Sequence, residues 1–481
     1  MQYDVIIIGG GLGGLFAGAK LSKEGKSVLL LEQHDRPGGC ATTFTRKGFT
    51  MEVGLHEMDG LHPADGKNKI FNDLGVFDKV EFLPLPEFYR FIHQDTDLVM
   101  PHNKEAAISL LKDKFPDQSK GIDTYFNRLM NARRINTMER NKPDSSIGDY
   151  LDSIFTNEEI KLFLLGNLGY FHDDPYSLSL KYFSMAEGAY FNGRANFIKG
   201  GSQKLSNAMV DIIRENGGKV LLNHKVSSIQ LDENNKVTGL RFINSLPGNH
   251  TMIECTAKDI VANASLSEIA GLLGVNNGKI ITDKTAKQTI GASLITVYLG
   301  FEKALKDMGH KYYSTFVFDD SIKTMRDIKE NNQAWFDKRS FTFIDYSQID
   351  SALAPEGKSV GSVCAIDYYD NWDKMDNAEY KVKKREAQQL IIERLGRIVP
   401  GIPSNISHVE TGTAKTVKRY TLNPEGAVYG FAKHPDNKPV GPIPEIENLH
   451  IASAWGKFGG GFSGAIFGGY MTAIDMLRRK D

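Results

Sequence analysis

The chain has 481 residues, and its 58 Lys and Arg against 59 Asp and Glu leave a net charge of −1 at pH 7. This balance excludes the strongly basic face that nucleic acid binding requires. The three cysteines lie far apart, with no C-x-x-C pair and no metal-ligand spacing, which argues against a disulfide framework or a metal site and favours the cytoplasm. Much of the glycine is concentrated near the two ends of the chain.

The N-terminal residues predict a β-α-β unit. Residues 4–9 are a short isoleucine-rich run that ends at glycine, which is typical of a buried parallel strand. Residues 12–23 have the periodicity of a helix, and residues 27–31 form a second apolar run closed by Glu32.

The glycines between the first strand and the helix carry the strongest motif. Gly9, Gly11 and Gly14 satisfy G-x-G-x-x-G, and Glu32 follows 32 − 9 = 23 residues after the first of them. We expect a tight turn at Gly9, approach of a pyrophosphate at Gly11, and close packing of helix on sheet at Gly14. The phosphates would meet the helix N-terminus at Leu12 and Gly13, and Glu32 would bind the adenosine ribose.

The loop after Glu32 favours FAD over NAD. Arg36, Pro37, Gly38 and Gly39 supply a second loop that a ligand can approach closely. A NAD domain has no need of such a loop, whereas the longer ribityl chain of FAD continues past this point. No second G-x-G-x-x-G follows a strand, so NAD(P)H would have to act as a diffusing reductant or through a partner protein.

The rest of the chain predicts two interleaved bodies. The patterns indicate helices at 105–115, 122–138, 203–216, 381–397 and 463–476, and strands at 48–55, 220–222, 225–231, 237–242, 293–301, 312–318, within 341–366, and at 449–452. The uncharged stretch 458–474 has 17 residues, six of them glycine, and is too short to span a membrane. The N-terminal residues are not expected to form a secretory signal, and the chain shows no internal repeat of 20 to 50 residues.

Three segments carry a resemblance to a known family. "LEQHDRPGGCATTFTRKGFTMEVGLH", "FIKGGSQKLSNAMVDIIRENGGKVLLNHKVSSI" and "ENLHIASAWGKFGGGFSGAIFGGYMTA" resemble the phytoene desaturase and flavin amine oxidase superfamily. Within it, the first string looks most like the branch of all-trans-retinol saturase and carotenoid isomerase. The match covers both ends and the middle of the chain.

The resemblance implies an α/β FAD-binding Rossmann-like domain with a mostly parallel sheet, interleaved with an α+β substrate-binding domain, as in glutathione-reductase-type FAD proteins and amine oxidases. We place the FAD-binding domain at residues 1–62, 196–272 and 408–481, and the substrate-binding domain at 63–195 and 273–407. Further FAD contacts are expected at Gln33, Cys40, Ala41, Thr42, Val226, Ser453, Gly461, Phe462 and Ser463. Many flavoproteins have Gly-Asp where this chain has Ser453-Ala454, which suggests weaker, reversible binding.

His56 and Glu57, just after the strand at 48–55, are the polar residues expected closest to the flavin ring, where they would handle protons. Tyr429 is a further candidate. The inserted segments are rich in aromatic residues, which suit either a tunnel for a long apolar substrate or an ordinary core. This set comprises Phe82, Phe88, Tyr89, Phe91, Phe163, Tyr170, Phe171, Tyr176, Tyr182, Phe183, Tyr190 and Phe191.

The sequence therefore predicts an FAD-dependent oxidoreductase acting on carbon–carbon double bonds of a long conjugated substrate such as a carotenoid or retinoid, by saturation, desaturation or isomerisation. One alternative is a flavin-dependent amine oxidase, for which Lys457 could be mistaken as the lysine beside the flavin. The other is a non-enzymatic prenyl-binding escort protein. Arg133, Arg134, Arg140 and Lys142 form either a peripheral membrane contact or a solvated helix face.

Overall fold

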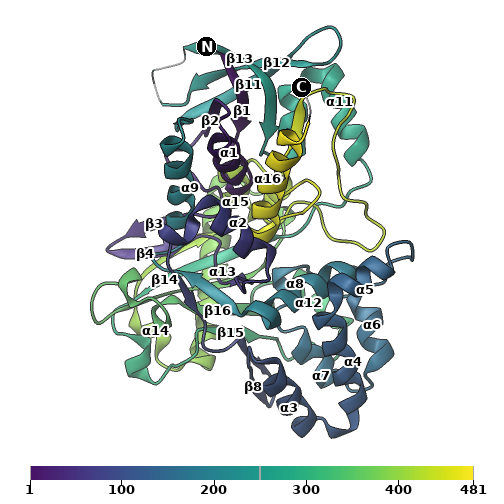
Figure 1. The fold of residues 1–481 in the computed structure, drawn as a ribbon. Helices are drawn as coiled ribbons and strands as arrows, with labels where there is room; N and C mark the ends of the chain where they lie inside the picture. Colours follow the sequence, from purple (N-terminus) through teal and green to yellow (C-terminus); the bar gives the residue numbers. More distant parts are fainter. Residues whose placement is uncertain (1, 247, 249–250, 480–481) are drawn as a thin grey trace.

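One large sheet holds the N-terminal strand near its centre (Figure 1). The computed structural model describes residues 2–246, 248 and 251–479. The strands of this sheet are β1 (Gln2–Ile8), β2 (Val28–Leu31), β10 (Lys219–Leu221), β11 (His224–Leu231), β12 (Val237–Asn244), β13 (Met252–Ala262) and β19 (Leu449–Ile451).

The order β10-β2-β1-β13-β12-β11 is parallel from β10 to β13 and antiparallel beyond it. The last strand, β19, runs parallel to the end of β13, beyond the part that β12 covers. Side chains of β1 alternate between two cores: Val5 and Ile7 face one side, while Ile6 and Ile8 face the other. The carboxyl ends of β1, β2, β13 and β19 therefore meet at one edge, where α/β sheets bind ligands.

Helix α1 (Leu12–Lys23) packs between two helices that come from distant parts of the chain, α9 (Gln203–Glu215) and α16 (Gly461–Leu477) (Figure 1). Glycines allow this approach: a Cβ at Gly18 would lie 2.9 Å from Cδ1 of Ile213 on α9, and one at Gly469 would lie 2.0 Å from the Gly13 oxygen. The two ends of the chain are thus locked together by backbone contact. The body also contains α2 (Gly66–Leu74), α10 (Leu266–Leu272) and α11 (Gly274–Thr285).

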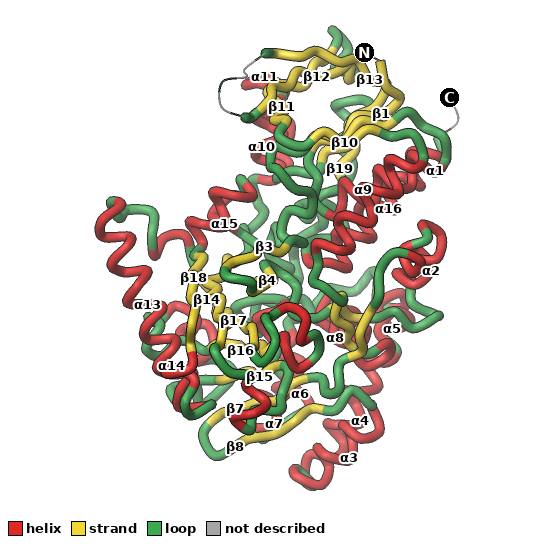
Figure 2. The backbone as a smooth tube through the Cα atoms, turned by 90° about the vertical axis from the view of Figure 1, so that its left-hand side faces the viewer, coloured by secondary structure: helices red, strands yellow, loops and turns green. Residues whose placement is uncertain are grey.

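The second body is built on another seven-stranded sheet, in the lower half of Figure 2. In spatial order its strands are β18 (Ile406–Gly412), β14 (Ser293–Phe301), β17 (Ser359–Asp367), β16 (Phe341–Asp345), β15 (Ser314–Val317), β7 (Tyr89–His93) and β8 (Thr96–Met100). Neighbours are antiparallel except β15 and β7. Strand β18 runs across the predicted domain limit at 408.

Helices surround this sheet, and small sheets join the bodies. The helices are α3 (Lys104–Lys114), α4 (Ser119–Met130), α5 (Ala132–Met138), α6 (Ile147–Ile154), α7 (Glu158–Leu164), α8 (Leu180–Gly193), α12 (Asp327–Gln333), α13 (Asn377–Ile398), α14 (Ile402–Asn405) and α15 (Ala414–Thr421). The small sheets are β3 (Thr43–Arg46) with β4 (Phe49–Glu52), and β5 (Met58–Asp59) and β6 (Phe82–Pro84) on either side of β9 (Ala195–Ile198).

Two elements differ from the sequence prediction. The helix expected at 122–138 is broken at Asn131, whose side chain donates to the carbonyl oxygen of Asn127 at 3.1 Å. Strand β13, which no pattern had indicated, is the neighbour of β1 in the sheet. Among the described residues, no helix has both the length and the apolar character needed to cross a membrane.

Candidate functional site

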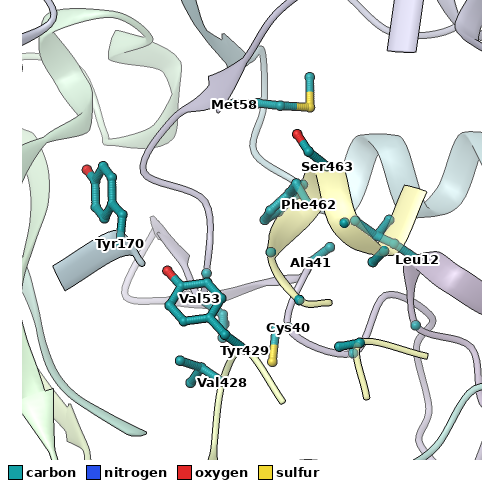
Figure 3. A pocket seen from close by; sticks show the side chains of 18 of the residues that line it. Leu12, Cys40, Ala41, Val53, Met58, Tyr170, Val428, Tyr429, Phe462 and Ser463 are labelled. Atoms are coloured by element: carbon teal, nitrogen blue, oxygen red, sulfur yellow. The ribbon is translucent and has the colours of Figure 1, made fainter. Parts of the chain in front are cut away.

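A cavity of about 1870 Å³ lies between the two bodies. It starts at the carboxyl ends of β1 and β2 and reaches the second sheet and helix α8. Figure 3 shows residues from both ends of the chain around it: Leu12 and Ala41 from the N-terminal part, and Phe462 and Ser463 from α16. Drug-sized ligand pockets measure roughly 300–1,000 Å³, so this cavity has room for a dinucleotide together with a second molecule.

The glycine turn after β1 has the geometry that the motif predicted. Gly9 has φ +96°, a conformation that glycine adopts without strain. A Cβ at Gly11 would have one neighbour within 4 Å, the Nδ2 atom of Asn263 at 3.1 Å, and would otherwise face open space. The turn is held by Asn263 at the end of β13, whose Nδ2 donates to the oxygens of Gly9 and Gly11 at 3.1 and 3.3 Å.

Sequence reasoning missed Asn263. Its position at the carboxyl end of a parallel strand would have been the signal, but the strand itself was not predicted.

Glu32 is buried at the wall of the cavity. Its carboxylate accepts the backbone N–H of Gly10 at 2.7 Å and that of His34 at 2.9 Å. The second glycine loop lies directly beside the first, because the N–H of Gly38 donates to the Gly10 oxygen at 2.7 Å. The two loops and the acid thus form one rim, which fits the diphosphate and ribose of a dinucleotide.

Nearly all the residues proposed for the cofactor lie on the wall of this cavity. They are Gly9, Gly11, Leu12, Gly13, Glu32, Gln33, Arg36, Gly38, Gly39, Cys40, Ala41, Thr42, Val226, Ser453, Gly461, Phe462 and Ser463. Gly14, the third glycine of the motif, does not line the cavity; it sits against the Gly9 carbonyl, in the close-packed position that the motif predicts for it.

Helix α16 begins at the cavity. Gly460 precedes the first residue of α16 and has no side chain to cap the helix. The N–H groups of the first turn therefore favour negative charge in the part of the cavity that they border. The hydroxyl of Ser463 donates to Asp59, and the Nζ of Lys67 lies 2.8 Å from the other oxygen of that carboxylate. Lys67 is almost fully buried and also lines the cavity, a cation that sequence reasoning missed.

His56 follows β4 and lies on the cavity wall, where the second sheet reaches it. Its backbone oxygen accepts a hydrogen bond from the Tyr313 hydroxyl. Its Nε2 is 3.3 Å from the Sγ of Cys364, a residue of β17. Burial lowers the pKa of His56 to about 4, so the imidazole is neutral at physiological pH.

Glu57 also lines the cavity, and both of its carboxyl oxygens are buried with no hydrogen-bond partner among the described residues. Burial raises the pKa of Glu57 well above its usual value, and the neighbouring Glu187 raises it further. Glu187, on α8, accepts a hydrogen bond from Asn167 at 2.9 Å, and burial raises its pKa to about 8. Burial therefore favours the protonated form of both carboxyls, which makes Glu57 a candidate acid at the cavity.

The predicted aromatic set divides into two groups. Tyr170, Phe171, Tyr182 and Tyr190 line the cavity, whereas the others do not and mostly form core. Tyr429 lies on the cavity wall beside the start of α16 (Figure 3), and burial raises the pKa of its hydroxyl. The far part of the cavity is thus walled by rings and by apolar residues of the second sheet.

The basic residues and Lys457 lie at the surface. Arg133, Arg134, Arg140 and Lys142 are exposed on and after α5, and Arg133 reaches the rim of the cavity. Their contact with a membrane stays a prediction. Lys457 is exposed and does not line the cavity, so it has no position from which to act on a ligand there.

Comparison with curated proteins finds similar chains. All-trans-retinol 13,14-reductase of Danio rerio is 25% identical over 99% of this chain and 86% of its own length. Prolycopene isomerase of Daucus carota, a chloroplast protein, is 26% identical over 92% of this chain and 73% of its own.

Among solved structures, an oxidoreductase from Methanosarcina mazei superposes with a TM-score of 0.68 over the whole of both chains at 17% identity. This likeness confirms the predicted two-domain fold class. The model of the family described as flavin containing amine oxidoreductase matches residues 12–477. The chain therefore belongs to the flavin-containing amine oxidoreductases, and its cofactor is a flavin.

Proposed function

We propose that this protein is an FAD-dependent oxidoreductase that acts on carbon–carbon double bonds of a long conjugated apolar substrate of the carotenoid or retinoid type. The observation that carries the proposal is the cavity itself. It continues from the glycine rim to an aromatic wall, and its lining includes the buried Glu57, whose pKa burial raises. The names of the two similar proteins, a retinol reductase and a prolycopene isomerase, support this substrate class.

The residues that would hold FAD are those on the rim. The loops at Gly11 and Gly38 would bind the diphosphate, Glu32 the ribose, and Val226 of β11 the adenine side through its backbone. The first turn of α16, with Ser463 and the buried Lys67, would face the flavin ring. A bound flavin supplies hydride or single-electron transfer, and the N–H groups and cation there would stabilise negative charge on its reduced form.

The chain's own residues supply orientation and protons. The aromatic and apolar wall binds a polyene and excludes water. Glu57 is a buried carboxyl on the cavity wall, and its raised pKa favours the protonated form. It can deliver a proton to a substrate carbon, because a buried neutral acid retains its proton until a negative charge develops nearby. His56 is neutral, and the Tyr313 hydroxyl bound to its backbone oxygen fixes its position on the cavity wall.

The test uses purified protein reconstituted with FAD and incubated without oxygen with all-trans-retinol and with a poly-cis carotene, in the oxidised and the reduced state. Product mass and chromatographic retention distinguish the reactions: two hydrogens gained for saturation, two lost for desaturation, and an unchanged mass with a shifted retention time for isomerisation. We expect one of these products, and a large loss of rate in Glu57→Gln at unchanged flavin content.

Two outcomes would replace the proposal. Oxidation of amines with release of peroxide, and no polyene product, would make the protein an amine oxidase. A protein that stays colourless with added FAD but binds isoprenoids would make it an escort protein.

A further inference from the structure

A second, smaller cavity of about 300 Å³ adjoins the main one. The two share a wall that includes Tyr182, Tyr429 and Ile366. Its remaining walls include residues 289–294, where β14 begins, residues 172–173 and 431–434, and the charged residues Lys329 and Glu425. No residue of the glycine rim lines it, so it lies apart from the region fitted to the dinucleotide.

Three polar side chains on this small cavity make no hydrogen bond from the atom in question to any residue in 2–246, 248 and 251–479. They are the Oγ of Ser293 and the Nε2 of His172, which are buried, and the Nζ of Lys433, which is half-buried. Ser293 is 2% exposed and the His172 side chain 7%. Buried polar groups normally have partners, because leaving one unpaired costs roughly 1–3 kcal/mol. Two such buried groups and an unpaired ammonium group around one space indicate a missing polar ligand.

The position of His172 is fixed by a carboxylate that cannot serve Lys433 as well. The Nδ1 of His172 lies 2.8 Å from Oδ1 of Asp173, and Oδ2 of the same residue accepts the Tyr368 hydroxyl at 2.5 Å. The imidazole therefore turns its other nitrogen away from the carboxylate.

Lys433 is a cation on the wall of this cavity, which Lys329 also lines. Its ammonium group lies 5.9 Å from the centre of the Tyr182 ring, and its end packs over Gly459. Burial lowers its pKa to about 8, which is the effect of an apolar surrounding without a counter-charge. An ammonium group has three donors and no acceptor, so the ligand that completes it must present an oxygen.

Where the main cavity adjoins the small one, its lining is apolar and includes Phe171, Leu294 and Ile366. An amphiphilic molecule would therefore place its chain in the large cavity and its polar end in the small one. We propose that the small cavity is the subsite for an oxygen-bearing end group, such as a hydroxyl or carboxylate, of the polyene substrate. This inference rests on the proposed function and narrows its substrate class to oxygenated, retinoid-like polyenes rather than hydrocarbon carotenes.

The test is a binding titration on the FAD-loaded protein with a matched pair of probes: all-trans-retinol and the hydrocarbon in which its hydroxyl is replaced by hydrogen. Quenching of protein fluorescence gives Kd for each. We expect wild type to prefer the alcohol by about tenfold or more, corresponding to about one charge-assisted hydrogen bond. Lys433→Met should remove most of that preference by raising the Kd of the alcohol, while the Kd of the hydrocarbon stays within about twofold of its wild-type value.

Ser293→Ala should reduce the preference for the alcohol by a smaller factor. Because this substitution changes the side-chain volume little, it tests the inference even if the Lys433→Met protein does not fold. Lys438→Met, an exposed lysine on the same loop that lines neither cavity, is the matched control and should bind like wild type.

Equal binding of the two probes by wild type would overturn the inference and leave the proposed function standing. So would a Lys433→Met protein whose flavin spectrum shifts while its preference is kept, because the lysine would then serve the cofactor. If neither probe binds, the proposed function fails and the inference with it.

Discussion

The rim and the far wall of the main cavity are built on different principles. At the rim, backbone atoms form most of the surface: Gly9, Gly11 and Gly38 hold two loops side by side, and few side chains reach the ligand space. At the far wall, side chains from β14, β17, α8 and the loop at Tyr429 define the space. The rim is therefore suited to one invariant ligand, whereas single substitutions can reshape the wall for different substrates.

The largest effect is expected at the rim. Gly11 has φ −70° and ψ 170°, which valine adopts readily, and a side chain there extends into open space. Gly11→Val should therefore keep the fold and lower bound flavin by more than about tenfold, measured by visible absorbance after reconstitution. Full flavin content would show that the diphosphate lies elsewhere.

The matched variant is Gly14→Val, three residues along the same motif. Its Cβ would overlap the Gly9 oxygen at 2.2 Å, so it should lose stability by about 1–3 kcal/mol or more as well as flavin. Thermal unfolding of the two variants therefore separates loss of the ligand from loss of the fold.

The next largest effect is expected at the far wall. His56→Ala should retain flavin, because His56 lies away from the glycine rim, but turnover should fall about 10²-fold as the wall beside Cys364 loses its order. Since burial lowers the pKa of His56 to about 4, wild-type kcat/KM should show no inflection near pH 6.5 that this variant removes. Unchanged steady-state kinetics would exclude His56 from the mechanism.

A smaller effect concerns stability and pH. Burial raises the pKa of Glu187 from 4.5 to about 8, so between these values the folded state binds more protons than the unfolded state. The free energy of unfolding contributed by this group therefore falls as pH rises through that window, by up to about 1.4 kcal/mol per pH unit.

Glu187→Gln keeps an oxygen for Asn167 and cannot ionise, so its unfolding free energy should decline less between pH 5 and 8, as urea denaturation would measure. The exposed Glu233→Gln should follow the wild-type slope. A Glu187→Gln slope equal to that of wild type would mean that Glu187 ionises normally in the folded protein.

The smallest effect is expected at Lys457, which is exposed and off the cavity. Lys457→Met should change kcat, KM and flavin content by less than about twofold, in line with surface substitutions in general. A large loss of activity would revive the idea that this lysine acts beside the flavin, as the amine oxidase alternative supposes.

The sequence predicted the residues of the rim more completely than those of the far wall. Residues 12–23 were predicted as the helix that α1 forms, and all the cofactor residues except Gly14 lie on the cavity. At the wall, His56, Glu57 and Tyr429 were found, but Cys364, Tyr313 and Glu187 were not, because they come from β17, the segment before β15, and α8. Nothing in their local sequence points to His56 or Glu57.

By itself, the sequence determined the glycine turn, the acid at the end of β2 and the family of the chain. These features are local: a turn, a helix start and a strand end are specified by residues adjacent in the chain. Only the tertiary structure decided that the pKa of Glu57 is raised and that of Lys433 is lowered. Both properties arise from burial and from charges brought together by folding, and the energy of a charge depends on the surroundings that distant segments provide.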